Sequence, residues 1–157
     1  MKNNNYSFIV FVILVLVSLF YTSKSSSDEI TKFLSLKNDE VNLRQGPSFD
    51  YPVKLIYKKK NLPVKIIDKL ETWRKIIDFE KNSGWVHISQ LSKKKAAINI
   101  KNNSIMYKKK TIYSKPIAKL EKGRLVLIKE CEEKWCKISS GKFKGWFFKK
   151  NLWGKFK

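Results

Sequence analysis

Hydrophobic and polar residues alternate in short runs from Phe33 onward, separated by stretches rich in glycine, proline, asparagine, serine and lysine. Alternation with a period of two predicts half-buried β strands, and the breaks between the runs predict turns. No helix-period stretch of useful length occurs after residue 37. The pattern therefore predicts an all-β fold, a small barrel or sandwich. The strands expected in the first half of the chain are Val41–Leu43, Val53–Tyr57, Leu62–Ile67, Trp73–Phe79 and Trp85–Ile88.

The second half of the chain repeats the first. A Trp, an Ile three residues later, a Gly-Trp pair and a closing Leu occur twice, at Trp73 to Leu91 and at Trp135 to Leu152. An internal repeat of this length indicates a tandem of two units, 33–93 and 96–155, rather than one domain. The strands expected in the second unit are Ala97–Ile100, Ser104–Tyr113, Ile117–Leu120, Leu125–Lys129, Trp135–Ile138 and Trp146–Phe148.

Residues 1–27 have the pattern of an export segment. Lys2 supplies a short basic start, Phe8 to Tyr21 is an apolar run, and Thr22 to Ser27 is small and polar. The apolar run has the length of a signal-peptide core and is shorter than the roughly 20 residues of a membrane-spanning helix. We expect a signal peptide that is removed, with a retained membrane anchor as the alternative. A periplasmic or cell-envelope location follows from either.

The chain is strongly basic, with a formal net charge of +21. Such a charge attracts polyanions, and the attraction weakens with salt. However, nearly all of the basic residues are lysine, and phosphate or base recognition more often uses arginine. Three lysine runs, 58–60, 93–95 and 108–110, fall at predicted turns or strand ends. Solvated turns explain these runs, and the alternative is a patch for an anionic wall polymer, a lipid head group or nucleic acid.

The two cysteines, Cys131 and Cys136, flank Glu132 to Trp135. This spacing suits the two ends of a tight hairpin, where facing strand positions come close enough for a disulfide, and an exported chain keeps such a bond. A zinc site needs about four ligands, and only His87 is available beyond the two cysteines. The spacing also differs from the Cys-x-x-Cys motif of redox proteins. We predict a structural disulfide.

No pattern of residues points to catalysis. His87 is the only histidine, and no motif places a serine, cysteine or carboxylate beside it. Paired carboxylates, a phosphate-binding glycine loop and a nucleophile elbow are not found. We therefore expect a protein that is not an enzyme and has no cofactor and no metal site.

The repeated motifs resemble the bacterial SH3-like (SH3b) domains, in the tandem form of exported proteins. The resemblance rests on Val41 to Ser48 (VNLRQGPS), on Trp73 to Leu91, and on Cys131 to Gly154. It implies a bent five-stranded barrel for each copy and binding to cell wall or peptide. It also implies that an opening loop with Arg44, Gly46 and Pro47 helps to shape a ligand groove. The second copy has only Ser114-Lys115-Pro116 there, so its groove is in doubt.

The aromatic residues of the first copy are sorted by strand alternation. Val86 and Ile88 share one face and are expected in the core, whereas Trp85 and His87 share the other face. Trp73 is likewise expected on the face opposite Ile76. The functional hypothesis is a shallow groove for an extended peptide or glycan. The alternative is that these large side chains fill and cover the core. The groove residues would be Tyr51, Tyr57, Trp73 and Trp85.

The strand Leu125 to Ile128 is apolar on both faces. A strand of this kind is expected to be covered on its outer face, either by the first barrel or by the tail that contains Trp153 and Phe156.

The sequence thus predicts an exported, non-enzymatic tandem protein that binds peptidoglycan or an envelope protein. A structural adaptor without glycan affinity is the alternative from a different class. Binding of nucleic acid through the lysine-rich surface is disfavoured because export removes the chain from most nucleic acid. A membrane is expected as a partner only through an uncleaved N-terminal anchor.

Overall fold

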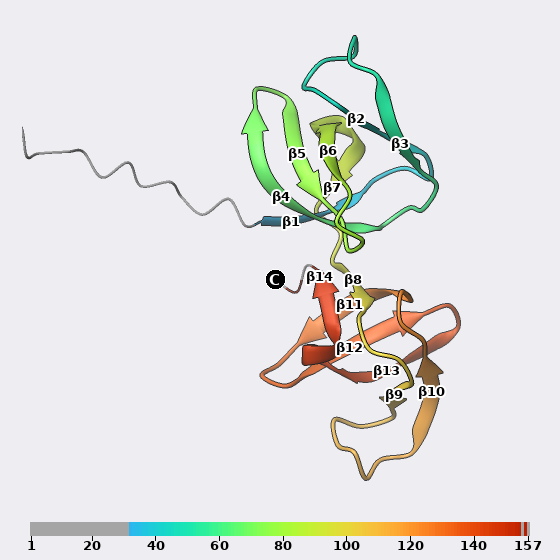
Figure 1. Ribbon diagram of the computed structural model, residues 1–157. Helices are drawn as coiled ribbons and strands as arrows, with labels where there is room; N and C mark the ends of the chain where they lie inside the picture. The colour runs from blue at the N-terminus through green and yellow to red at the C-terminus, as the bar shows by residue number, and fades with distance from the viewer. Residues whose placement is uncertain (1–31, 155, 157) are drawn as a thin grey trace, which may run out of the picture.

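The computed structural model describes residues 32–154 and 156, which form two antiparallel β sheets one after the other in the chain (Figure 1). Residues 1–27, expected to direct export, lie outside the described residues. The first sheet has the strand order β3-β2-β6-β5-β4-β1-β7. Its strands are β1 (Lys32–Leu36), β2 (Val41–Arg44), β3 (Val53–Tyr57), β4 (Pro63–Leu70), β5 (Trp73–Ile77), β6 (Ser83–His87) and β7 (Leu91–Ser92), with a 3-10 helix η1 (Ile88–Gln90) before β7.

The second sheet repeats the first strand for strand, with the order β10-β9-β13-β12-β11-β8-β14. The tandem all-β prediction is confirmed. The expected strand count was too low: the opening strand of the first sheet was not expected, and a closing strand of two or three residues completes each sheet. The strands are β8 (Ala96–Asn99), β9 (Ser104–Tyr107), β10 (Pro116–Leu120), β11 (Leu125–Cys131), β12 (Trp135–Ser140), β13 (Phe143–Phe148) and β14 (Leu152–Gly154), with η2 (Lys149–Asn151) before β14.

Each sheet curls around its own hydrophobic core. Strand alternation places Ile76 and Val86 in the first core, both fully buried, as expected. Ile88 was expected beside Val86, and this was wrong: Ile88 is 42% exposed. Strand β6 ends at His87 and η1 begins at Ile88, so the alternation stops one residue too early to bring Ile88 inward.

The repeated Gly-Trp pair marks the place where two strands come closest. A Cβ atom on Gly84 would lie 2.6 Å from the carbonyl oxygen of Arg44 in β2, and one on Gly145 would lie 2.6 Å from the carbonyl oxygen of Tyr107 in β9. A contact of this length to backbone leaves no room for any side chain. The glycines are therefore needed for the close approach of β2 to β6 and of β9 to β13.

The predicted disulfide is confirmed. Cys131 and Cys136 face each other across the β11–β12 hairpin and are bonded. Cys136 is fully buried in the second core, so the bond ties the hairpin turn to the core.

We expect Cys131→Ser/Cys136→Ser to lower the free energy of unfolding by about 2 kcal/mol, because a short closed ring restricts the unfolded chain only modestly. Urea denaturation of the oxidised protein and of the double variant measures the difference. An equal stability of the two proteins would contradict the prediction.

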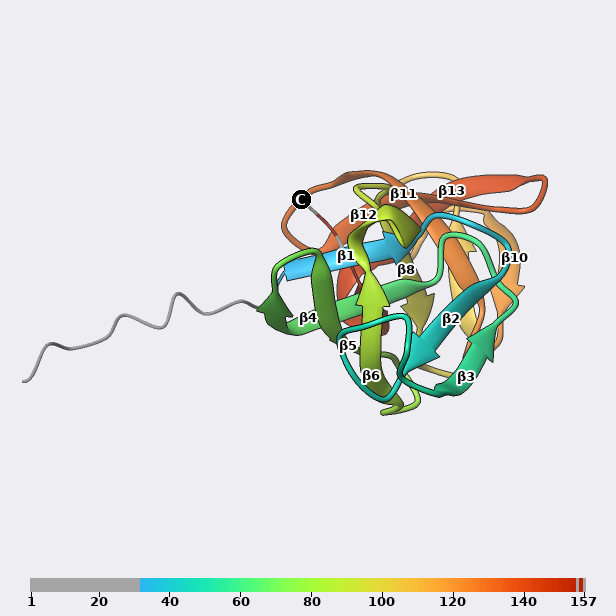
Figure 2. The same cartoon turned by 90° about the horizontal axis from the view of Figure 1, so that it is seen from above.

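The two sheets meet along β14, where Trp153 reaches the first domain. Its ring lies 4.9 Å from the ring of Phe33 and 6.1 Å from that of Phe79, both measured between centroids. Ser35 in β1 also donates a hydrogen bond of 2.8 Å to the Lys94 carbonyl of the linker. Seen from above, the first unit lies over the second (Figure 2).

The outer face of β11, expected to be covered, borders a hollow that the first domain also lines. Val126 and Ile128 lie in the second core, and Leu127 points the other way. Leu127 lines a cavity together with first-domain and linker residues, among them Asn61 and Lys94. The tail contributes differently, because Phe156 packs against the second core.

Candidate functional site

The outer face of the first sheet carries the two predicted tryptophans. In the register of β5 and β6, Trp73 stands opposite His87 and Lys75 stands opposite Trp85. These four side chains therefore share one face, and Ile76 belongs to the core on the other, as alternation predicted. Trp73 and Trp85 are thus on the same side of the sheet.

Trp73 is nevertheless almost fully covered, with 7% of its surface exposed. The ring of Phe49, from the loop between β2 and β3, lies 4.9 Å from it in an edge-on arrangement, and the His87 ring lies 5.3 Å away. Phe49 itself is 65% exposed. The accessible aromatic surface at this place is therefore Phe49, and Trp73 supports it from below. Sequence reasoning missed Phe49, although an aromatic residue between Ser48 and Asp50 in a polar loop was a usable signal.

Arg44 holds this loop against the sheet. Its Nη1 donates to the carbonyl oxygens of Phe49 at 3.0 Å and of Tyr51 at 2.7 Å, and its guanidinium carbon lies 5.7 Å from the Phe49 ring centroid. The Tyr51 ring occupies the space that a side chain at residue 46 would need, since its atoms lie 2.6 Å from a Cβ built on Gly46. Arg44 and Gly46 thus shape the opening loop, and Pro47 lies partly buried within it.

A depression of about 160 Å³ opens beside Phe49. We call it the aromatic groove. It combines an aromatic wall with a cation, a carboxylate and amide groups, so it offers stacking together with both hydrogen-bond donors and acceptors. Its lining residues are Glu40, Asn42, Arg44, Phe49, Trp73, His87 and Gln90. The Nδ1 atom of His87 is engaged with the Ser89 hydroxyl at 2.7 Å.

The four residues predicted to form one groove are distributed over several places. Trp85 lies in an adjoining depression with Lys54 and Lys75. Tyr51 packs on the opening loop and is 47% exposed. Tyr57 belongs to the core, because it ends β3 opposite Val41 with its side chain on the inner face. The expectation of a single groove is therefore corrected: Trp73 and Trp85 share a face, and Tyr57 does not lie on it.

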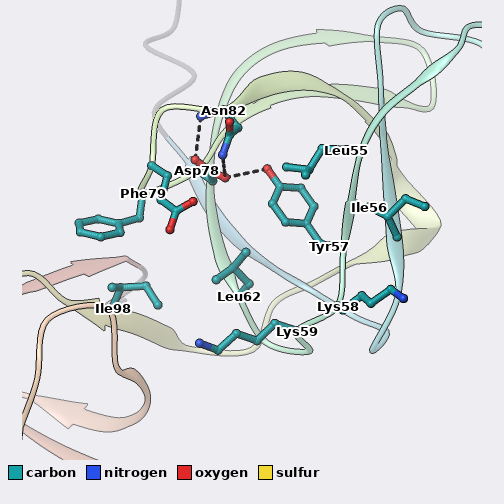
Figure 3. A pocket seen from close by; sticks show the side chains of 12 residues that line it. Leu55, Ile56, Tyr57, Lys58, Lys59, Leu62, Asp78, Phe79, Asn82 and Ile98 are labelled. Carbon is teal, nitrogen blue, oxygen red and sulfur yellow. Dashed lines mark hydrogen bonds between the residues drawn. The ribbon is translucent and has the colours of Figure 1, made fainter.

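Tyr57 belongs to a buried polar network (Figure 3). Its hydroxyl donates to Asp78 at 2.9 Å, and the Asn82 backbone and side-chain nitrogens donate to the same carboxylate at 2.8 and 2.9 Å. Burial, and then the Asp78 charge, raises the pKa of the Tyr57 hydroxyl far above its usual range, so the group stays protonated and remains a donor. The Tyr57 hydroxyl and both Asp78 carboxylate oxygens are hydrogen-bonded, which is typical of a structural network.

The same region borders a cavity of about 280 Å³ between the domains. Phe79 of the first domain and Ile98 of the second both line it (Figure 3). Lys59 and Glu80 also line it, so a positive and a negative side chain are both present at its edge. The cavity is therefore formed mainly by the first domain, and Ile98 and Gly123 of the second domain complete its wall.

The second domain has a different outer face. The Trp135 ring stacks on Phe148 at 4.1 Å and meets Tyr107 edge-on at 5.8 Å. Tyr107 takes the register position that Arg44 has in the first domain, because Arg44 pairs with Trp85 and Tyr107 pairs with Trp146. A tyrosine cannot make the two hydrogen bonds with which Arg44 holds its loop. The first domain's groove is therefore not reproduced here.

Two small antiparallel sheets with an inner core and an aromatic outer face define a tandem of SH3-like β domains. The chain belongs to the bacterial SH3 domain family, which matches it twice, over residues 37–93 and 101–154. No curated protein matches it.

Similar solved structures include NlpC2 and NlpC1 from Trichomonas vaginalis, at 12% and 13% identity with TM-scores of 0.37 and 0.36, over 81% and 85% of this chain and 49% of each of those chains. An NlpC/P60 family protein from Bacillus cereus is similar at 10% identity and a TM-score of 0.36, over 78% of this chain and 56% of that one. The chain thus spans about half the length of these structures. At such low scores we draw nothing about function from them.

Within the described residues, no helix has the length and apolar character that a membrane crossing requires. No group of three or more histidine, cysteine, aspartate or glutamate side chains there is arranged to hold a metal ion.

Proposed function

We propose that the protein is an exported, non-enzymatic module that binds peptidoglycan through the aromatic groove of its first domain. The observation that carries this proposal is Phe49, a largely exposed ring that is fixed on Trp73 and held by Arg44. A fixed aromatic ring binds the apolar face of a sugar or an extended peptide without first losing side-chain entropy.

The polar lining suits the stem peptides of peptidoglycan. Arg44 offers a cation to a peptide carboxylate, and Glu40 offers a carboxylate to an amine. Asn42 and Gln90 offer amide groups to a peptide backbone. The net positive charge of the chain adds long-range attraction to an anionic wall.

Export supports this function and is itself part of the proposal. Residues 1–27 would direct the chain across the membrane, and the disulfide is of a kind that persists outside the cytoplasm. N-terminal sequencing of the protein recovered from the envelope fraction tests this step. A protein that is found only in the cytoplasm would contradict it.

Phe49→Ala should reduce retention on purified peptidoglycan about tenfold, because truncation of a central aromatic contact typically costs binding energy of this order. Phe143→Ala is the matched control, since Phe143 is an exposed phenylalanine of the second domain. Trp85→Ala tests whether the ligand extends into the adjoining depression. The proposal fails if the wild-type protein stays in the supernatant at low salt, or if Phe49→Ala and Phe143→Ala behave alike.

The contact between the domains favours a second candidate function, a structural adaptor without glycan affinity. Trp153 with Phe33 and Phe79 would hold the two barrels in one orientation, as an adaptor requires. This candidate predicts a stoichiometric envelope protein in co-purification and no retention on wall fragments.

A further inference from the structure

The loop between β9 and β10, residues 108–115, exposes two neighbouring apolar side chains. Tyr113 is 92% exposed and Ile112 is 53% exposed. Tyr113 has the largest exposed fraction among the large hydrophobic side chains of the described residues, ahead of Phe49 at 65%. In Figure 1 this loop forms the lower tip of the second domain, remote from the first. We call it the β9–β10 loop.

Its counterpart in the first domain is folded inward. There Arg44 holds the β2–β3 loop, so that Phe49 packs on Trp73. The second domain has Tyr107 in place of Arg44, and its loop has no such hold on the sheet. The apolar pair of the β9–β10 loop stays exposed, whereas Phe49 in the first domain packs one side of its ring on Trp73.

The β9–β10 loop is ordered by its own hydrogen bonds. The Lys108 nitrogen donates to the Lys115 carbonyl at 3.0 Å, and the Lys109 nitrogen donates to the Ser114 hydroxyl at 2.8 Å. The Ser114 nitrogen donates to the Thr111 carbonyl at 3.2 Å. Because the chain is already fixed, a partner would not have to order the loop on binding.

Lysines surround the apolar pair on both sides. Lys108, Lys109, Lys110 and Lys115 lie within the loop, all exposed, and the loop contains no acidic residue. The Lys110 ammonium also reaches Glu132 at 2.8 Å and lies 5.8 Å from the Trp146 ring centroid, so part of this charge is neutralised. The remaining lysines face solvent around the exposed Ile112 and Tyr113.

We propose that the β9–β10 loop docks the protein on a bilayer that contains anionic phospholipid. Ile112 and the Tyr113 ring enter the interface, the Tyr113 hydroxyl stays among the head groups, and the lysines contact lipid phosphates. A water-soluble polyanion would satisfy the lysines and leave the projecting apolar pair in water, whereas a bilayer satisfies both. The loop lies on the other domain from the aromatic groove, so this docking is independent of peptidoglycan binding.

The experiment measures sedimentation with vesicles of phosphatidylcholine, with and without phosphatidylglycerol. The protein is used as cells produce it, and all variants share residues 1–31, so any binding by that segment is common to them. Ile112→Ser/Tyr113→Ser and Lys108→Gln/Lys109→Gln/Lys110→Gln should each weaken binding to the anionic vesicles about tenfold or more. Lys58→Gln/Lys59→Gln/Lys60→Gln, the matched control, removes the same charge from the β3–β4 turn and should have a much smaller effect.

A local readout separates docking by the loop from binding by any other segment. A bimane label on Tyr113→Cys should shift its emission to the blue with anionic vesicles, and the same label on Lys59→Cys should not. Equal effects of the two lysine triple variants, or no shift at residue 113, would overturn the proposal. Binding of an acidic protein or of nucleic acid that is lost in the Lys108 triple variant, without vesicle binding by the wild type, would also overturn it. Phe49→Ala should bind the anionic vesicles as the wild type does. The vesicle assay therefore tests membrane docking separately from peptidoglycan binding.

Discussion

Gly84→Ala and Gly145→Ala are each expected to lower the free energy of unfolding by about 3 kcal/mol. The new methyl group would meet the carbonyl oxygen of Arg44 or of Tyr107 at 2.6 Å, and a side-chain atom of Leu43 or Met106 at 2.8 Å. Backbone cannot move aside as the end of a flexible side chain does, so β2 or β9 would have to separate from its partner strand. Alanine should gain about 0.5 to 1 kcal/mol over glycine in a strand interior, which is too little to offset the clash.

Gly141→Asn is the control for these two variants. Gly141 lies in the turn between β12 and β13 with φ of 55°, no atom lies within 4 Å of its Cβ position, and asparagine tolerates this conformation. We expect the stability of Gly141→Asn to stay close to that of the wild type in urea denaturation. If Gly84→Ala were equally neutral, the close approach would not explain why the Gly-Trp pair is repeated.

The repeat carried most of the information that the sequence held about the fold. The stretches Leu62–Ile67 and Arg124–Lys129 lie at the same distance before a Trp, and they fall in β4 and β11, which occupy the same position in their sheets. Most strands of four residues or more were found because alternation is visible over that length, but β1 was missed and the strand expected over 104–113 ends at Tyr107. Strands β7 and β14 were missed because they have two or three residues and follow a 3-10 turn, so no alternation precedes them.

The candidate site was predictable only in part, since alternation sorts strands and not loops. It placed Trp73 and Trp85 on the outer face correctly. It could not show that Phe49 would cover Trp73, because the path of that loop depends on hydrogen bonds from Arg44 to two carbonyl oxygens. Tyr57 was assigned to the groove for its aromatic character, yet its position opposite Val41 places it on the inner face, where its hydroxyl donates to Asp78.

Trp153→Ala is expected to lower the free energy of unfolding by about 2 to 3 kcal/mol and to uncouple the two domains. The side chain is half-buried, so the loss should be smaller than for a tryptophan in a closed core. Its main partners, Phe33 and Phe79, belong to the other domain, so the variant removes contacts between the domains. Calorimetry should change from one transition in the wild type to two in the variant.

A double-mutant cycle and a second tryptophan variant define what this result means. Trp153→Ala combined with Phe33→Ala should show a coupling energy of about 0.5 to 1.5 kcal/mol, the range of edge-on aromatic pairs.

Trp85→Ala removes a half-buried tryptophan that lies within the first domain, so it should lower stability without splitting the transition. Two transitions already in the wild type would mean that the domains unfold independently, and the adaptor function would lose its physical basis. A single transition in Trp153→Ala would instead assign the coupling to other contacts, such as the hydrogen bond from Ser35 to the Lys94 carbonyl.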